Sequence, residues 1–314
     1  MKWSVSALMM GACFVAEAAP SEQWAAAERV LARHEPFTEQ ADLTYGHAGG
    51  VDLKGDLFLP EDRSEPRPGM LVIHGGGWVN GDKVGQAHFR QMARDYARIG
   101  FVVFNVNYRL AGIAKAPAAV EDVKCAVRFM HAHAKEWGMD PERIVVTGGS
   151  AGSHLALMVG LCDDPAFSGK GGWEDYPETV AAVINRFGIT DVADVTYGKN
   201  PRGWAKAWLP LNTPGGEELA RRLSPVSYAG REKLPPVLTI HGAEDPIVPV
   251  EHAMRLHLAL LDHGHQSELF VVPFMGHGGG ITRYEQISDD VAHERDCRRI
   301  DFLIRSGILS EGKK

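Results

Sequence analysis

Apolar and polar positions follow one another along the chain in a pattern that predicts strands and helices in turn. Residues 21–38 predict an exposed helix and a loop, and short strands are expected over residues 43–45 and 51–59. Residues 60–69 are polar and contain prolines, which predicts a loop. Residues 70–73 are then an uninterrupted apolar run, as in a strand that is covered on both faces.

Beyond residue 70, short apolar runs alternate with longer amphipathic segments. The runs that predict strands are residues 101–106, 144–147, 180–187, 237–240 and 268–272. The segments that predict helices are residues 88–99, 118–137, 153–161, 252–263 and 291–304. This alternation predicts the α/β fold class, with one mostly parallel sheet and helices on both faces.

The alternation is interrupted over residues 188–236, an interval that is long for a plain connection. We expect either a small cap or lid over the functional site or an irregular, solvated excursion. Four aromatic side chains are assigned to the expected cap, two of them from before residue 188, and they either stack on a sugar or aryl group or form the core of the cap. They are Trp173, Tyr176, Trp204 and Trp208.

The first residues have the pattern of an export signal. Lys2 precedes an apolar run over residues 5–15, and Ala-Glu-Ala at residues 16–18 predicts cleavage after Ala18, which leaves residues 19–314 as a single domain. An uncleaved N-terminal helix is the alternative, and a lipoprotein modified at Cys13 has weaker support. The run is too short to span a bilayer, so we expect no stable membrane insertion.

Composition narrows the classes of partner. The chain has 314 residues, of which 45% are hydrophobic and 23% charged, as in an ordinary globular protein. Its 33 basic and 40 acidic residues give a net charge of −7. Basic residues form no cluster longer than a pair, which argues against a nucleic-acid partner.

Three cysteines, Cys125, Cys162 and Cys297, would remain after signal cleavage, so at most one disulfide is expected. The sequence shows no CxxC pair and no Cys/His ligand spacing. We therefore expect the cysteines to be buried as small hydrophobic residues, and we expect no metal site.

The strongest chemical motif is Gly-Gly-Ser-Ala-Gly at residues 148–152, between an expected strand and an expected helix. A G-x-S-x-G pattern on a sharp strand-to-helix turn lifts the serine oxygen above the sheet edge, and small residues two positions away relieve the crowding. The N-terminus of the following helix favours developing negative charge. Ser150 is therefore the expected nucleophile.

A second motif, His-Gly-Gly-Gly-Trp at residues 74–78, directly follows the strand over residues 70–73. Its glycines let the backbone approach a substrate and point N–H groups at one spot, which predicts an oxyanion hole with the amide of Ala151 as a further donor. His74 is expected to brace this loop. A phosphate-binding loop is disfavoured because the motif lacks the Lys-Ser/Thr ending of a P-loop and the spacing of a dinucleotide fingerprint.

A serine nucleophile needs a base, and the base needs an acid that orients it. His277 lies in a glycine-flanked turn after the strand over residues 268–272 and is the expected base. Asp245 follows the strand over residues 237–240 and is the expected acid, with Glu244 as its competitor. The chain order is then Ser, Asp, His. We interpret His241 as structural because it precedes the acid at the end of its strand.

Other titratable residues have weaker signals. Four histidines populate one helix and the turn after it, and without a second set of ligands they indicate a solvated surface rather than a metal site. They are His252, His257, His263 and His265. Asp191 and Asp194 follow another strand end, where they could shape the site.

Together with residues 107–110 and 117–122, these motifs resemble the bacterial esterase/lipase group of the α/β-hydrolases, from about residue 43 to residue 304. This group includes hormone-sensitive-lipase-like esterases and acetyl-xylan or feruloyl esterases. The resemblance implies an α/β-hydrolase fold and a serine hydrolase that needs no cofactor. It also implies site residues: a triad of Ser150, Asp245 and His277, and oxyanion donors at Gly76, Gly77 and Ala151.

The segment after Leu110 reads Ala-Gly-Ile-Ala-Lys, where lipase-like esterases usually continue with Ala-Pro-Glu. With Trp78 and Gly-Asp-Lys at residues 81–83, it is more similar to the xylan-esterase branch, and Trp78 is expected to contact the substrate. This branch implies an exported enzyme that acts on acetyl or feruloyl esters of polysaccharide, or on generic short-chain esters. The alternatives are an arylformamidase-like amide hydrolase and a non-catalytic binding protein of the same fold.

Overall fold

The computed structural model describes residues 23–209, 211, 214–279 and 289–311. The export signal predicted over residues 1–18 lies outside the described residues. In the part of the chain that is described, no helix has both the length and the apolar character needed to cross a membrane.

The described residues form one sheet of eight strands in the order β1-β2-β4-β3-β5-β6-β7-β8. Strand β2 (Val51–Pro60) pairs antiparallel with both of its neighbours, which are β1 (Phe37–Ala48) and β4 (Val102–Val106). All other pairs are parallel. The remaining strands are β3 (Arg67–Ile73), β5 (Met139–Gly148), β6 (Ala182–Arg186), β7 (Val237–Gly242) and β8 (Ser267–Val272). The predicted α/β class and mostly parallel sheet are therefore confirmed.

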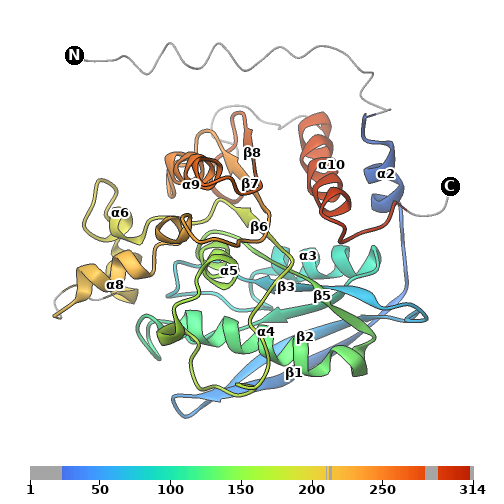
Figure 1. Cartoon of the computed structure of the whole chain (residues 1–314), viewed down its shortest axis with the longest axis horizontal. Helices are drawn as coiled ribbons and strands as arrows, with labels where there is room; N and C mark the ends of the chain where they lie inside the picture. The colour runs from blue at the N-terminus through green and yellow to red at the C-terminus, as the bar shows by residue number, and fades with distance from the viewer. Residues whose placement is uncertain (1–22, 210, 212–213, 280–288, 312–314) are drawn as a thin grey trace.

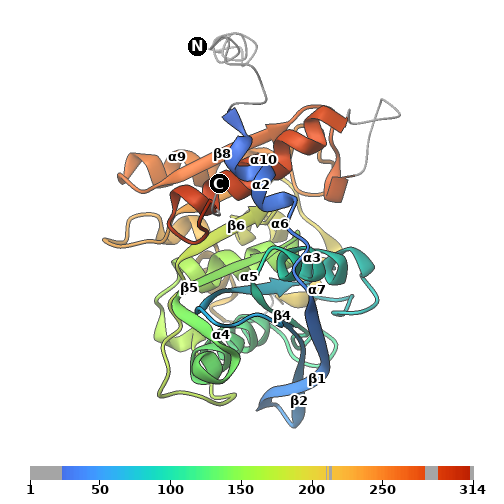
Figure 2. The ribbon, with the colours of Figure 1, turned by 90° about the vertical axis from the view of Figure 1, so that its right-hand side faces the viewer.

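Helices cover both faces of the sheet (Figure 1, Figure 2). One face packs against α2 (Ala25–Leu31), α3 (Ala87–Arg98) and α10 (Asp289–Arg305). The other face packs against α4 (Ala118–Trp137), α5 (Ala151–Leu161) and α9 (Glu251–Asp262).

Strand β3 shows why a continuous apolar run is needed at the centre of the sheet. Leu71 and Ile73 belong to the apolar cluster under α4 and α5, whereas Met70 and Val72 belong to the cluster under α3 and α10. Because successive side chains of a strand point to opposite faces, a strand covered on both faces must be apolar at every position.

Several element boundaries differ from the prediction, among them those of β1, β3 and β5, which begins at Met139 instead of residue 144. Strand β1 extends from Phe37 to Ala48 instead of covering only residues 43–45. Its first half is exposed at the edge of the sheet, and an exposed edge strand has no apolar periodicity to reveal it. Strand β3 begins at Arg67, inside the predicted loop, with a shift of register between Arg67 and Gly69 around Pro68. Proline is tolerated at such an irregularity because it has no ladder N–H to lose.

The long interval over residues 188–236 contains short helical segments, which are α6 (Val192–Thr196), α7 (Gly203–Trp208), α8 (Gly216–Arg222) and the 3-10 turn η3 (Pro225–Tyr228). Val195, Trp208 and Leu223 are buried and join the same apolar cluster as α4 and α5. The described part of this interval is therefore packed on the domain rather than an irregular excursion.

Candidate active site

Ser150 lies at the junction of β5 and α5 with backbone angles φ 56° and ψ −120°, a region that L-residues rarely occupy. The turn is tight against β3. A Cβ atom at Gly148 would lie 2.5 Å from the carbonyl oxygen of Ile73, and one at Gly152 would lie 2.2 Å from the same oxygen. Glycine at both positions is thus a steric requirement of this turn.

Backbone hydrogen bonds hold the turn in place. The N–H of Ser150 donates to the carbonyl oxygen of Arg186 at 3.0 Å, and the N–H of Arg186 donates to Oγ of Ser153 at 2.8 Å. The last residue of β6 therefore clamps the chain on both sides of the turn. Strain at Ser150 is supported by the surrounding structure, as is typical of functional sites.

Ser150 lines a cavity of about 420 Å³ at the carboxyl ends of the parallel strands, the usual place for a binding site in an α/β sheet. His277 and the glycine loop at residues 75–77 line the same cavity. The apolar side chains on its wall are Val79, Phe89, Phe187, Trp204 and Ile247. The cavity therefore combines a serine, a histidine and a mainly apolar wall.

His277 is held by Asp245. Nδ1 of His277 lies 2.7 Å from Oδ2 of Asp245, whose side chain is fully buried. The other carboxylate oxygen, Oδ1, accepts hydrogen bonds from the N–H groups of Ile247 at 2.8 Å and Val248 at 2.9 Å. The turn after β7 thus fixes the carboxylate, and the carboxylate fixes the imidazole ring of His277.

A second histidine contacts Asp245. Nε2 of His241 lies 3.4 Å from Oδ2 of Asp245 and 2.8 Å from the carbonyl oxygen of Val248. Burial alone would raise the pKa of Asp245, but hydrogen bonds with His241 and His277 outweigh it and hold that pKa well below its usual range. The sequence predicts only a structural role for His241, although its spacing of four residues from the acid is a signal for this contact.

The glycine loop after β3 is tightly folded. Gly76 and Gly77 have φ angles of 105° and 62°, and a Cβ atom at Gly76 would lie 2.0 Å from the carbonyl oxygen of Asn80. Among the described residues, the N–H groups of Gly76 and Gly77 donate no backbone hydrogen bond. The N–H of Ala151 is in the first turn of α5, where no acceptor exists within the helix. These three donors are available to a bound oxyanion.

His74 supports this loop from behind. Its ring stacks on Tyr108 at 4.3 Å, and its Nδ1 lies 2.8 Å from the carbonyl oxygen of Gly75. The hydroxyl of Tyr108 donates to the carbonyl oxygens of His74 and Gly75, each at 3.2 Å. Burial lowers the pKa of His74 to about 4, so its ring is neutral near pH 7.

The expectation that Trp78 contacts the substrate is wrong. Trp78 is fully buried, stacks on Trp208 at 4.1 Å and meets the edge of His154. It does not line the cavity, because the positive φ angles of Gly77 and Trp78 turn the chain so that the indole packs against α5 and α7. Trp204, 5.4 Å from Trp78 between ring centroids, lines the cavity instead.

The other aromatic candidates lie away from this cavity. Trp208 is buried in the core. Trp173 donates a hydrogen bond from Nε1 to the carbonyl oxygen of Tyr45 and contacts Tyr176 edge-on at 6.4 Å. Neither Trp173 nor Tyr176 lines the cavity.

Of the histidines expected at the surface, His252 is buried, so that interpretation is wrong for this residue. Its Nε2 lies 3.1 Å from Oδ2 of Asp194, and the two form a buried pair behind the strand ends. His263 is exposed, as expected. Cys125, Cys162 and Cys297 are buried and free, which confirms the expectation for the cysteines.

The strand order, the serine at the strand-to-helix turn and the order Ser, Asp, His along the chain define the α/β-hydrolase fold. Residues 55–260 match the BD-FAE family, so the chain belongs to that family. The structure is similar to that of esterase Est2 from Thermogutta terrifontis, with a TM-score of 0.71 at 26% identity, over 90% of this chain and 95% of that one. Est2 has also been solved phosphorylated by paraoxon.

Curated relatives point to the same class of protein. The chain is 31% identical to the probable carboxylic ester hydrolase LipM of Mycobacterium tuberculosis, over 72% of this chain and 52% of LipM. It is 31% identical to the esterase LipQ of the same organism, over 74% of this chain and 55% of LipQ. The chain thus spans about half the length of these two relatives. The fold and family expected from the motifs are confirmed.

Proposed function

We propose that this protein is a serine-dependent carboxylic ester hydrolase in which Ser150, His277 and Asp245 form the catalytic triad. One observation carries the proposal. Ser150 and His277 line one cavity. The buried Asp245 contacts Nδ1 of His277, which leaves the other ring nitrogen, Nε2, to accept the proton of the serine. This is the arrangement that turns a serine hydroxyl into a nucleophile.

The proposed reaction has two steps. Oγ of Ser150 attacks the ester carbonyl while Nε2 of His277 takes the hydroxyl proton, and Asp245 stabilises the charged imidazole. The N–H groups of Gly76, Gly77 and Ala151 bind the oxyanion, and each donor is worth about 3 kcal/mol in the transition state. The alcohol leaves with the proton from His277, and water then releases the acid from Ser150 by the same route. The chain's own residues supply every group in this scheme.

The test is hydrolysis of a short nitrophenyl ester by the purified protein. We expect Ser150→Ala to abolish turnover, and a fluorophosphonate probe to label the peptide that contains Ser150. Ser64→Ala changes an exposed serine that does not line the cavity. It is the matched control and should keep full activity. Normal turnover by Ser150→Ala, or labelling of another residue, contradicts the proposal.

For the substrate, we propose a short acyl ester, with acetyl or feruloyl groups on polysaccharide as the natural form. Est2 has been solved with propionate bound. The chain is also 32% identical over 40% of its length to versiconal hemiacetal acetate esterase of Dothistroma septosporum. Release of acetate and ferulate from acetylated and feruloylated xylan should be compared with turnover of simple nitrophenyl esters. Preference for the simple esters would leave a generic short-chain esterase.

An amide substrate is the second candidate. The chain is 38% identical over 41% of its length to arylacetamide deacetylase of Oryctolagus cuniculus, which favours this alternative. An oxyanion hole and a triad act on amides as well as on esters. A higher kcat/KM for an aryl formamide or acetamide than for the matched ester would make amide hydrolysis the main activity.

We further propose that the protein is exported, with cleavage after Ala18. The support is the charged residue Lys2, the apolar run over residues 5–15 and the Ala-Glu-Ala pattern. N-terminal sequencing of protein secreted by a bacterial host should begin at Ala19. Retention of Met1 in a soluble intracellular product would contradict export.

A further inference from the structure

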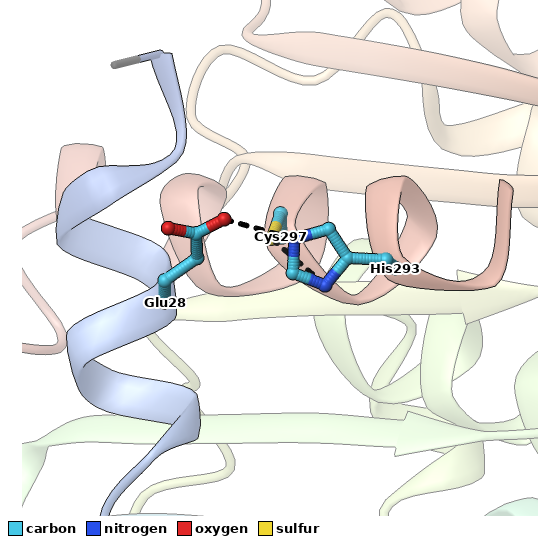
Figure 3. A group of neighbouring side chains, drawn as sticks. All are labelled: Glu28, His293 and Cys297. Carbon is cyan, nitrogen blue, oxygen red and sulfur yellow. Dashed lines mark hydrogen bonds and ion pairs between the residues drawn. The ribbon is translucent and has the colours of Figure 1, made fainter. Parts of the chain in front are cut away.

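Three side chains that can bind metals meet where α2 packs on α10, on the face of the sheet that also carries α3 (Figure 1, Figure 2). Glu28 belongs to α2, and His293 and Cys297 belong to α10. Figure 3 shows Glu28 pointing from α2 towards the two α10 residues. His293 and Cys297 are four residues apart, so they share one face of their helix.

The distances suit a metal ion. Nε2 of His293 lies 3.0 Å from Oε1 of Glu28 and 3.4 Å from Sγ of Cys297, and the three ligand atoms all lie within 4.8 Å of one another. Zinc bonds of about 2.0–2.3 Å in tetrahedral geometry place such atoms about 3.4–3.6 Å apart. The two distances that involve His293 are therefore within a few tenths of an ångström of those in a zinc site.

Acidic side chains lie around the sulfur of Cys297. Cys297 is fully buried, and the carboxylates of Glu28, Asp296 and Asp301 lie near it. Asp296 is paired with Arg295 and Arg299, and Asp301 is paired with Arg305. A metal ion that binds a cysteine displaces the thiol proton and takes the thiolate as its ligand. Arg298, the residue after Cys297 on α10, is paired with Glu294 and lies over the ring of Trp24.

We propose that Glu28, His293 and Cys297 bind one divalent transition-metal ion, Zn²⁺ in preference, at the seam between α2 and α10. Thiolate, imidazole and carboxylate are the ligands that zinc prefers, and the half-exposed His293 leaves the fourth position open to water. Binding releases the proton of Cys297 to solvent. The ion ties the N-terminal helix to the C-terminal helix, and it takes no part in chemistry at Ser150.

The proposal departs from the expectation that the chain has no metal site. The third ligand lies 265 residues from His293 in the sequence, so only the packing of α2 on α10 brings it near. Within α10, a His-x-x-x-Cys pair supplies two ligands, which is too few to identify a site from the sequence.

The direct test is titration of the purified, reduced protein with Co²⁺ and with Zn²⁺. We expect one Co²⁺ per chain with a thiolate-to-cobalt charge-transfer band, and displacement of Co²⁺ by Zn²⁺. Cys297→Ser should remove the band, and His293→Gln should weaken binding by at least about ten-fold. Cys162→Ser changes a buried cysteine outside the proposed site. It is the matched control, and it should keep both the charge-transfer band and the affinity for the metal.

Thermal unfolding separates loss of binding from loss of folding. Glu28 is 40% exposed in its side chain, so Glu28→Gln should melt at the same temperature as the wild type without metal. Zn²⁺ should raise the melting temperature of the wild type and of Ser150→Ala, and should raise that of Glu28→Gln much less. The proposal is overturned if about 100 µM Zn²⁺ does not bind, if Co²⁺ binds without a thiolate band, or if all variants bind like the wild type.

Discussion

Nδ1 of His277 lies 2.7 Å from Oδ2 of Asp245, and this contact orients the ring that faces the cavity. Asp245→Asn keeps the size of the side chain but replaces the accepting carboxylate with an amide, which favours the wrong tautomer of His277. We expect kcat to fall by about 10⁴-fold. Stopped assays with nitrophenyl acetate measure this loss. A change of less than ten-fold in a folded variant would mean that another acid serves His277.

His241 is predicted to act through Asp245 as a positioning residue. Removing its hydrogen bond with His241→Leu should lower kcat by about 10–100-fold, the worth of a buried hydrogen bond to a charged group, while KM changes little. His241→Gln retains a donor at the same distance along the side chain and should recover most of the activity. Equal losses in both variants would indicate a packing role only.

The glycine at position 152 is predicted to be important for the stability of the fold. A Cβ atom there would lie 2.2 Å from the carbonyl oxygen of Ile73 and 2.5 Å from that of His74. Gly152→Ala should lower the free energy of unfolding by about 3 kcal/mol, measured by urea denaturation. Gly112→Ala is the control, because a Cβ atom at Gly112 meets nothing within 4 Å. Similar stability of the two variants would contradict the tight turn.

A buried histidine is predicted to make the protein sensitive to acid. His154 is fully buried on α5 with Nε2 2.8 Å from the carbonyl oxygen of Leu223, and burial lowers its pKa from 6.5 to about 4. Between these values the unfolded chain binds a proton that the folded chain does not. His154 therefore stabilises the fold fully above pH 6.5, and this contribution is lost as pH falls towards 4, by up to about 1.4 kcal/mol per pH unit.

Urea denaturation between pH 7 and pH 4.5 measures this effect. His154→Gln keeps a donor for Leu223 and removes the titration, so its stability should fall less steeply with pH than that of the wild type. His263→Gln, at an exposed histidine, should follow the wild type. The prediction fails if the His154→Gln and wild-type slopes coincide.

Trp204 is predicted to limit the size of the acyl or alkoxy group. It lines the cavity, and its ring lies about 3.0 Å from where a Cβ atom of Gly77 would be. Trp204→Ala should raise kcat/KM for nitrophenyl butyrate, relative to that for nitrophenyl acetate, by about ten-fold. The reason is that one methylene group in an apolar pocket changes kcat/KM by about this factor. An unchanged ratio would show that this wall does not contact the acyl group.

The sequence by itself determined the order and type of the elements. Apolar runs such as residues 70–73 must be strands covered on both faces, and the glycines at positions 148 and 152 are needed around Ser150 wherever this turn occurs. These features depend on local periodicity and on backbone sterics, which act over a few residues. The candidate serine, acid and base follow from their places at strand ends.

Only the tertiary structure decided which side chains meet. It buried Trp78, placed Trp204 on the cavity and brought Glu28 to His293 and Cys297. Each of these outcomes depends on the direction in which a side chain leaves a turn or on the packing of helices far apart in the chain. Such contacts arise from the closing of the whole core, so no local pattern of residues encodes them.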